Sequence, residues 1–332
     1  MVKNLVYFFP HLRSMQNSRE GESPAAELAL ENKPITEYMV GPAPLEGTNF
    51  DEDWACYRDD DVIRQQDAIQ AVEAEKIPLV GDKEHILALA EEFQSGSPVI
   101  QSKIKLLSEK YSNLRRTRGD GNCFFRGFMF SYLEHILDSQ DGSEVDRIQS
   151  SIVQCKKALQ DLGYAEFTFE DFFMLFIEQL QCVFNGHGDS YGHDELLKRS
   201  QDPSVSNYVV MFLRFVTTGE IRRRSDFYEP FILGISDSSV DQFCKTAVEP
   251  MGAESDQVQI IALSDALGVP IRVVYLDGST TSLEVNHHDF IPTLQDEKTQ
   301  SNEGSESKIN QSPEPFVTLL YRPGHYDILY AK

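Results

Sequence analysis

Cysteine is scarce in this chain, and no two cysteines are closely spaced. Five cysteines are spread over 332 residues, and no C-x-x-C sequence occurs. The odd number and the wide spacing of the cysteines argue against a disulfide framework and against a zinc knuckle. The pattern indicates a reducing compartment, in which a reactive thiol persists. The cysteines are Cys56, Cys123, Cys155, Cys182 and Cys244.

Long apolar runs and positive charge are also lacking. No stretch approaches the ~20 apolar residues that span a bilayer, and the N-terminal run 5–9 is too short for a signal peptide. The 30 basic and 53 acidic residues give a net charge of −23. Such a chain repels nucleic acid and anionic membranes, and its natural partner is a basic protein surface. We therefore expect a soluble protein of the cytoplasm and nucleus, with no nucleic-acid or membrane partner.

The most distinctive segment is residues 119–126, in which the polar turn Gly-Asp-Gly-Asn leads into Cys-Phe-Phe-Arg. After Cys123, apolar residues recur at helical spacing as far as Ile136, which predicts a buried helix beginning at Cys123. A helix N-terminus presents unpaired amides and the positive end of the helix dipole, both of which favour a thiolate. Gly119 and Gly121 allow several amides to point toward one oxyanion. An inert core cysteine is the alternative, but the glycines and the helix start favour a nucleophile.

The C-terminal segment supplies a base for that nucleophile. Two β-rich runs, 316–321 and 325–330, are separated by a turn that contains Pro-Gly, which predicts a hairpin. Residues two apart in a strand share a face, so His325 and Asp327 point the same way and the carboxylate can orient the imidazole. A solvated strand face is the alternative. The presence of the Cys123 turn favours a catalytic pair.

The two segments together resemble the catalytic blocks of the otubains, which belong to the ovarian-tumour (OTU) family of cysteine deubiquitinases. The upstream block reads Gly-Asp-Gly-Asn-Cys-Phe-Phe-Arg and the downstream block Tyr-Arg-Pro-Gly-His-Tyr-Asp-Ile-Leu-Tyr. Both occur in the family's order, and the resemblance covers about residues 45–332. It implies a papain-like OTU fold and thiol-dependent hydrolysis of isopeptide bonds in polyubiquitin, with no cofactor and no metal.

The resemblance also implies a role for each site residue. Cys123 corresponds to the nucleophile and His325 to the general base. Asp327 would orient His325, whereas Asp120 would shape the turn whose amides support the oxyanion. Whether Asp120 or Asp327 is the third catalytic member stays open. The implied substrate is the compact, proteasome-directing ubiquitin chain, with the extended, non-degradative chain as a second candidate.

Two other functions are compatible with the sequence. One is a non-catalytic binder of ubiquitin and a ubiquitin-conjugating enzyme that restrains conjugation; intact Cys, His and Asp positions argue against it. The other is a general papain-type peptidase, but the chain has no Cys-Gly-Ser-Cys-Trp block. Metal sites are not predicted at His187 and His193, which lie in a glycine-rich turn, or at His287 and His288, which are expected in an exposed loop.

The chain is expected to contain a flexible N-terminal arm, residues 1–45, and one catalytic domain, residues 46–332. Within the domain we expect a helical ubiquitin-binding region at about 59–113. A polar stretch at about 286–315 is expected to form a mobile loop between paired strands.

The apolar spacing predicts a class α+β fold, in which helices surround a small, mostly antiparallel sheet. The cysteine helix is expected to pack on the sheet that carries His325. Expected helices cover 59–76, 82–94, 98–113, 123–137, 143–162, 168–180, 203–218 and 256–267, and expected strands cover 271–276, 281–285, 316–321 and 325–330.

Several charged residues near the predicted site have open roles. The three arginines before the turn either end a helix at its negative pole or lower the pKa of the thiol. Glu254 is a candidate for holding His325 in a resting conformation. The three arginines are Arg115, Arg116 and Arg118.

Overall fold

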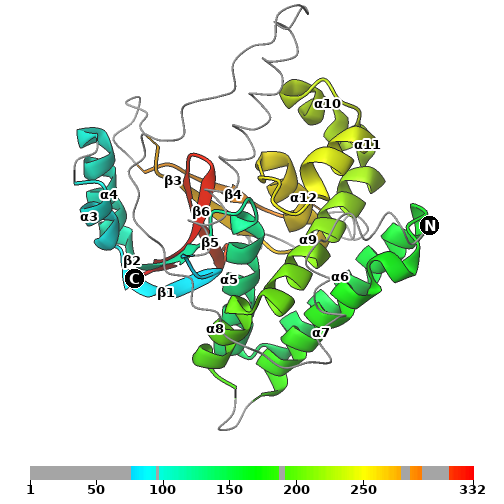
Figure 1. The fold of residues 1–332 in the computed structure, drawn as a ribbon, viewed down its shortest axis with the longest axis horizontal. Coiled ribbons are helices and arrows are strands. Elements are labelled where there is room, and N and C mark those ends of the chain that lie inside the picture. Colours follow the sequence, from blue (N-terminus) through cyan, green and yellow to red (C-terminus); the bar gives the residue numbers. More distant parts are fainter. Residues whose placement is uncertain (1–75, 95–96, 187–190, 278–284, 294–313) are drawn as a thin grey trace, which may run out of the picture. The chain divides into compact units, whose positions relative to one another are not determined.

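The computed structural model describes residues 76–94, 97–186, 191–277, 285–293 and 314–332 (Figure 1). The chain divides into two units, Met1–Arg58 and Asp59–Lys332, and every described residue belongs to the second unit. The predicted arm 1–45 and all but the last residue of the predicted helix 59–76 lie outside the described residues. Within the described ranges, no helix is both long enough and apolar enough to cross a membrane.

The described residues form a mixed α+β fold. The strands are β1 (Val80–His85), β2 (Tyr111–Thr117), β3 (Ile271–Tyr275), β4 (His287–Phe290), β5 (Val317–Arg322) and β6 (His325–Ala331). The helices are α3 (Ala88–Glu92), α4 (Pro98–Lys110), α5 (Cys123–Ser139), α6 (Gly142–Asp161), η3 (Glu166–Thr168), α7 (Glu170–Asn185), α8 (His193–Gln201), α9 (Pro203–Arg223), α10 (Ser225–Ile235), α11 (Val240–Phe243), η4 (Cys244–Val248) and α12 (Gln257–Leu267).

The six strands form one sheet in the order β1-β2-β6-β5-β3-β4. All neighbours are antiparallel except β3 and β5, which run parallel. The predicted C-terminal hairpin is confirmed: Arg322 of β5 lies opposite His325 of β6, and Gly324 in the turn has φ +74°. The mostly antiparallel sheet surrounded by helices is also confirmed.

Helices cover both faces of this sheet (Figure 1). Leu319 and Ile328 join the core cluster that contains α5, whereas their neighbours Leu320 and Leu329 join the cluster that contains α3 and α4. This alternation follows from the two-residue period of a strand. Gly127 allows α5 to approach closely, because a Cβ there would lie 3.1 Å from Leu319. The sheet and α5 therefore form one packed unit, and that unit positions the site.

Several predicted helix ends are confirmed. Ser97 caps α4 with Pro98 in its first turn. Asp202 caps α9 in the same way, its side chain accepting from the Ser204 amide. The start of α12 is a capping box between Asp256 and Gln259. In each case a short polar side chain satisfies an amide that the helix leaves unpaired.

Other predictions were wrong, chiefly around the two missed strands. The expected helix 82–94 is strand β1 followed by the short α3, and the expected helix 98–113 ends at Lys110, where β2 begins. Short apolar runs do not distinguish a strand from a helix, and here pairing of β2 with β1 and β6 decides the outcome. The helix expected over 203–218 continues to Arg223, so Gly219 lies within α9, where it faces Leu159.

The expected histidine loop was also partly wrong. His287 and His288 lie on β4, which pairs with β3, although both are exposed as expected. Most of the expected strand 281–285 and of the expected loop 286–315 lies outside the described residues. The helix expected from residue 168 begins instead at Glu170, after η3, and its N-cap residue Phe169 provides no side-chain cap.

Candidate active site

Cys123 is the first residue of α5, as predicted, and only 5% of it is exposed. Its thiol interacts with the imidazole of His325 at the start of β6, and this interaction raises the pKa of His325. The two groups meet because α5 packs on the central strands of the sheet. The juxtaposition expected from two segments far apart in the chain is therefore present.

His325 uses its ring to join Cys123 to Asp327. Its Nε2 lies 2.9 Å from Asp327 Oδ1, and its Nδ1 lies 3.7 Å from the position that a Cβ on Gly119 would take. Burial disfavours the charged ring, but hydrogen bonds to Asp327 and Cys123 outweigh burial and raise the pKa of His325 to about 9. The imidazole is thus held as an imidazolium at neutral pH and can pair with a thiolate.

Asp327 is completely buried, and both of its carboxylate oxygens are used. Oδ1 accepts from His325 and from the Thr117 amide at 3.1 Å, and Oδ2 accepts from Arg322 Nη2 at 2.7 Å. Burial alone would raise the pKa of Asp327. The hydrogen bond from His325 and the charge of Arg322 hold it below its usual range, so the buried carboxylate is ionised.

Asp120 lies in the turn before Cys123, where it binds other groups than His325. Its Oδ1 accepts from the Asn122 amide at 3.0 Å, and its Oδ2 accepts from Arg126 Nη2 at 2.6 Å. Burial opposes ionisation, but the charge of Arg126 lowers the pKa of Asp120. The Asp120 carboxylate thus stabilises the turn, whereas the Asp327 carboxylate contacts the imidazole.

A fully buried arginine holds this turn to the helices behind it. Arg214 of α9 donates to Asn122 Oδ1 at 2.7 Å and to the Gly121 carbonyl at 3.2 Å. It also donates to the carbonyls of Val248 and Ala253, each at 2.8 Å. Our sequence-based prediction missed Arg214. The available signal was a single arginine within the apolar run of α9, a position where an unpaired charge would be costly.

Arg126 is a second buried arginine that the prediction missed. It donates to Ser206 Oγ at 2.6 Å and to Asn207 Oδ1 at 2.9 Å, in addition to Asp120. Both acceptors belong to the first turns of α9. The two arginines together fix the turn between α5 and α9.

Gly121 lets the turn press against the segment between η4 and α12. Its φ is +72°, and a Cβ there would lie 1.8 Å from the Gly252 carbonyl oxygen. No side chain fits at that distance. Gly121 is therefore required both by backbone conformation and by close packing.

The amides of the turn are only partly available to an oxyanion. The Asp120 amide donates to the Arg118 carbonyl at 3.0 Å, and the Asn122 amide donates to Asp120. The Cys123 amide opens α5 and so has no helical acceptor. It is therefore a candidate donor to the oxyanion that forms on the substrate's carbonyl oxygen when the sulfur attacks.

The remaining charged residues differ from expectation. Arg115 and Arg116 lie on strand β2, so they do not end a helix, and Arg118 donates to the Ile77 carbonyl. Glu254 lies beside Gly324, with Oε1 3.9 Å from the position of an added Cβ. Since His325 contacts Asp327 and Cys123, the proposed resting contact with Glu254 is not present in the structure.

Metal binding has little support in the described ranges. No group of three or more His, Cys, Asp or Glu side chains there is arranged to hold a metal ion. His193 instead pairs with Asp138 at 2.9 Å. His187 lies outside the described residues.

Comparison with known proteins assigns the family. A family model described as Peptidase C65 Otubain matches residues 72–331. The chain belongs to the otubain family. Otubains are cysteine-type deubiquitinating enzymes, so both the predicted family and the predicted class of enzyme are confirmed.

Relatives of this otubain align over most of its length. It is 58% identical over 274 residues to the ovarian tumor domain-containing deubiquitinating enzyme 1 of Arabidopsis thaliana, which covers 81% of this chain and 86% of the relative. It is 41% identical over 275 residues to human ubiquitin thioesterase OTUB1, which covers 82% of this chain and 90% of the relative.

Solved otubain structures share the fold. A complex described as h/ceOTUB1-ubiquitin aldehyde-UBCH5B~Ub matches with a TM-score of 0.68 and 30% identity, covering 83% of this chain and 99% of that chain. A ceOTUB1 ubiquitin aldehyde UBC13~Ub complex matches with a TM-score of 0.69 and 30% identity, covering 81% and 99%. The predicted OTU fold is confirmed.

Proposed function

We propose that this otubain hydrolyses isopeptide bonds in polyubiquitin, with Cys123 as nucleophile and His325 as general base. The observation that supports this most strongly is the position of the His325 imidazole, which interacts with the Cys123 thiol on one side and lies 2.9 Å from Oδ1 of the buried Asp327 on the other. A nucleophile, a base and an orienting third group in contact are the parts that thiol-dependent acyl transfer needs.

The reaction proceeds in two halves. The Cys123 sulfur attacks the carbonyl carbon of the Gly–Lys isopeptide bond, and the Cys123 amide stabilises the oxyanion that forms. His325 gives its proton to the lysine nitrogen as the C–N bond breaks, which leaves a thioester. Water then attacks the thioester, His325 takes the water proton, and the sulfur leaves.

The two aspartates have different roles in this mechanism. Asp327 orients His325 and stabilises its charged form, so we assign Asp327 as the third catalytic member. Asp120 shapes the turn through Asn122 and Arg126, and thereby positions the amide of Cys123. Loss of Asp120 should therefore affect the geometry of the turn more than the proton affinity of the imidazole.

The preferred substrate is the compact chain that directs proteins to the proteasome, with the extended, non-degradative chain as a weaker substrate. The net charge of −23 suits the basic C-terminal tail of ubiquitin. A second ubiquitin docks through the region 59–113, whose described part comprises β1, α3, α4 and the first residues of β2.

A second function, binding of ubiquitin-conjugating enzymes, is favoured by one observation. The solved relatives were captured with UBCH5B~Ub and UBC13~Ub. In this role the protein restrains conjugation, and the N-terminal arm 1–45 contributes contacts. The discriminating variant is Cys123→Ser: inhibition of conjugation that persists in this variant supports the binding role, whereas its loss supports catalysis alone.

The test of the main proposal is cleavage of a panel of diubiquitins of each linkage. We expect the wild type to cleave the compact dimer at neutral pH and Cys123→Ala to be inactive. His325→Ala should lose roughly 10³-fold or more in rate. Cys155→Ala is the matched control, since Cys155 lies on α6 and bonds only to the Ala266 carbonyl at 3.6 Å. Cleavage that survives in Cys123→Ala contradicts the proposal.

A further inference from the structure

Two arginines and two carboxylates form a closed ring behind the candidate catalytic triad. Arg322 Nη2 lies 2.7 Å from Asp327 Oδ2, and Arg116 Nη1 lies 3.6 Å from the same oxygen. Glu92 joins the two arginines on the other side. Its Oε1 lies 2.8 Å from Arg322 Nη1 and its Oε2 lies 2.8 Å from Arg116 Nη2.

The ring is assembled from four separate elements and passes from core to surface. Asp327 belongs to β6, Arg322 to β5, Arg116 to β2 and Glu92 to α3. Exposure of the side chains rises from 0% at Asp327 through 17% and 24% at the arginines to 42% at Glu92. The contacts of Asp327 are therefore desolvated and strong, whereas those of Glu92 are screened by solvent.

The ring constrains the carboxylate that touches the imidazole. Oδ1 of Asp327 faces His325, and Oδ2 faces the arginines, so the carboxylate is held from both sides. The arginine charges also oppose the negative field that Asp327 exerts on His325. Glu92 offsets part of that positive charge, and it is the most exposed member of the ring.

We propose that Arg322 and Arg116 are positioning residues that hold Asp327, and that Glu92 orients them, so that this ring sets the proton affinity of His325. The inference rests on the proposed catalytic roles of Cys123 and His325. It adds residues of β2, β5 and α3 to the machinery, none of which takes part in the two steps of the reaction.

Other titratable groups lie beside the imidazole or beside the ring. Besides the ring itself, the thiol of Cys123 faces the imidazole from α5. Glu84 of β1 binds Arg116 Nε at 2.6 Å, and Glu254 lies beside Gly324. The test must therefore change ring members singly while these groups stay in place.

The experiment follows the pH dependence of two reactions in full-length protein. The first is alkylation of Cys123 by iodoacetate, measured by mass spectrometry of the Cys123 peptide, which needs no ubiquitin. The second is kcat/KM for diubiquitin cleavage. The variants are Arg322→Gln, Arg322→Lys and Glu92→Gln. Arg272→Gln is the matched control. Arg272 of β3 forms a comparable ion pair with Asp289 of β4 at 2.8 Å, and neither residue belongs to the ring.

The signs of the shifts follow from charge. Both rates are expected to fall at high pH as His325 loses its proton, and this fall is the alkaline limb of each profile. Arg322→Gln removes a cation, so the imidazolium is favoured and the alkaline limb of both profiles moves to higher pH by about half a pH unit. Its kcat/KM falls roughly tenfold, the effect of losing one charge-assisted hydrogen bond. Arg322→Lys recovers most of this loss. Glu92→Gln removes an anion and moves the limb downward by a smaller amount, and Arg272→Gln leaves it unchanged.

The outcomes are separable from those that test the proposed function. An alkaline limb that stays in place in folded Arg322→Gln overturns the inference. If Arg322→Gln does not fold, the decision passes to Glu92→Gln, where an unmoved or upward-shifted limb overturns it. Shifted alkylation without any diubiquitin cleavage in the wild type supports the ring and contradicts the proposed substrate.

Discussion

Arg214 donates a hydrogen bond of 2.7 Å to the side chain of Asn122, so a fully buried arginine of α9 holds the residue directly before Cys123. Burial lowers the pKa of this guanidinium to about 10. Its hydrogen-bond acceptors are one side-chain amide and three backbone carbonyls. Two of these acceptors belong to the turn and the other two are the carbonyls of Val248 and Ala253, so the buried charge joins the turn to the segment that includes η4.

Replacing Arg214 by Met should destabilise the protein by about 3 kcal/mol, because acceptors buried around the guanidinium lose their donors. Urea denaturation followed by circular dichroism measures this change. At a temperature where the variant stays folded, we also expect slower alkylation of Cys123, since the turn is no longer held. A loss of stability below about 1 kcal/mol would contradict a stabilising role for the hydrogen bonds of Arg214.

Gly121→Ala should abolish cleavage, because the added Cβ meets the Gly252 carbonyl in a backbone conformation that alanine rarely adopts. Gly163→Ala is the matched control. Gly163 also has a positive φ, +86°, but nothing lies within 4 Å of its added Cβ. The control should lose about 1 kcal/mol of stability and keep its activity. Equal activities of the two variants would contradict the packing argument.

The pH dependence of cleavage should follow His325. Since its pKa is raised to about 9, the imidazolium persists through neutral pH and is lost as pH rises through about 9. Asp327→Asn removes the negative acceptor, so the alkaline limb of kcat/KM should move down toward the ordinary histidine value of about 6.5. A limb that remains near 9 in Asp327→Asn would mean that another group controls the imidazole.

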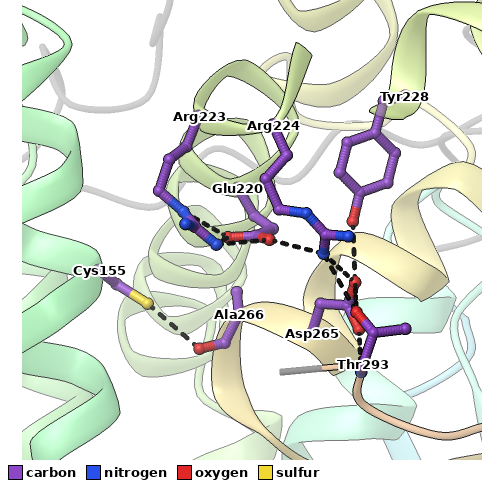
Figure 2. A network of polar contacts seen from close by, with 8 residues as sticks. All are labelled: Cys155, Glu220, Arg223, Arg224, Tyr228, Asp265, Ala266 and Thr293. Atoms are coloured by element: carbon purple, nitrogen blue, oxygen red, sulfur yellow. Dashed lines mark hydrogen bonds and ion pairs between the residues drawn. The ribbon is translucent and has the colours of Figure 1, made fainter. Parts of the chain in front are cut away.

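A second buried network joins α9, α10 and α12 away from the site (Figure 2). Arg224 bridges Glu220 and Asp265, whose carboxylate also accepts from the Thr293 amide at 2.8 Å. Arg224→Gln removes the cation that pairs with Asp265 and should lower the free energy of unfolding by about 2 kcal/mol. Arg223→Gln, whose arginine is 43% exposed and also bonds Glu220, should cost less than about 1 kcal/mol. Equal losses in thermal or urea unfolding would contradict this ranking.

The parts of the site that lie in contiguous segments could be predicted from the sequence. The helix that begins at Cys123 and the hairpin that carries His325 and Asp327 both have local signals, namely helical apolar spacing and a Pro-Gly turn. Caps such as Asp202 and Asp256 are equally local. These features depend on residues a few positions apart.

The features that were missed depend on contacts between distant segments. Strands β1 and β2 are short, and only the pairing of β1 with β2 and of β2 with β6 distinguishes them from the helices expected there. Arg214 and Arg322 each act through partners on other elements, so no local pattern indicates their roles. A charged residue inside an apolar run indicates a buried partner without identifying it.

The most direct test of the account is the site at which the protein forms a covalent bond with ubiquitin. Full-length protein is incubated with ubiquitin that carries an electrophile in place of its C-terminal carboxylate, and the adduct is mapped by mass spectrometry. We predict one ubiquitin per chain, attached to the sulfur of Cys123, and no adduct in Cys123→Ala. An adduct on Cys155, Cys182 or Cys244, or an undiminished adduct in Cys123→Ala, would contradict the account.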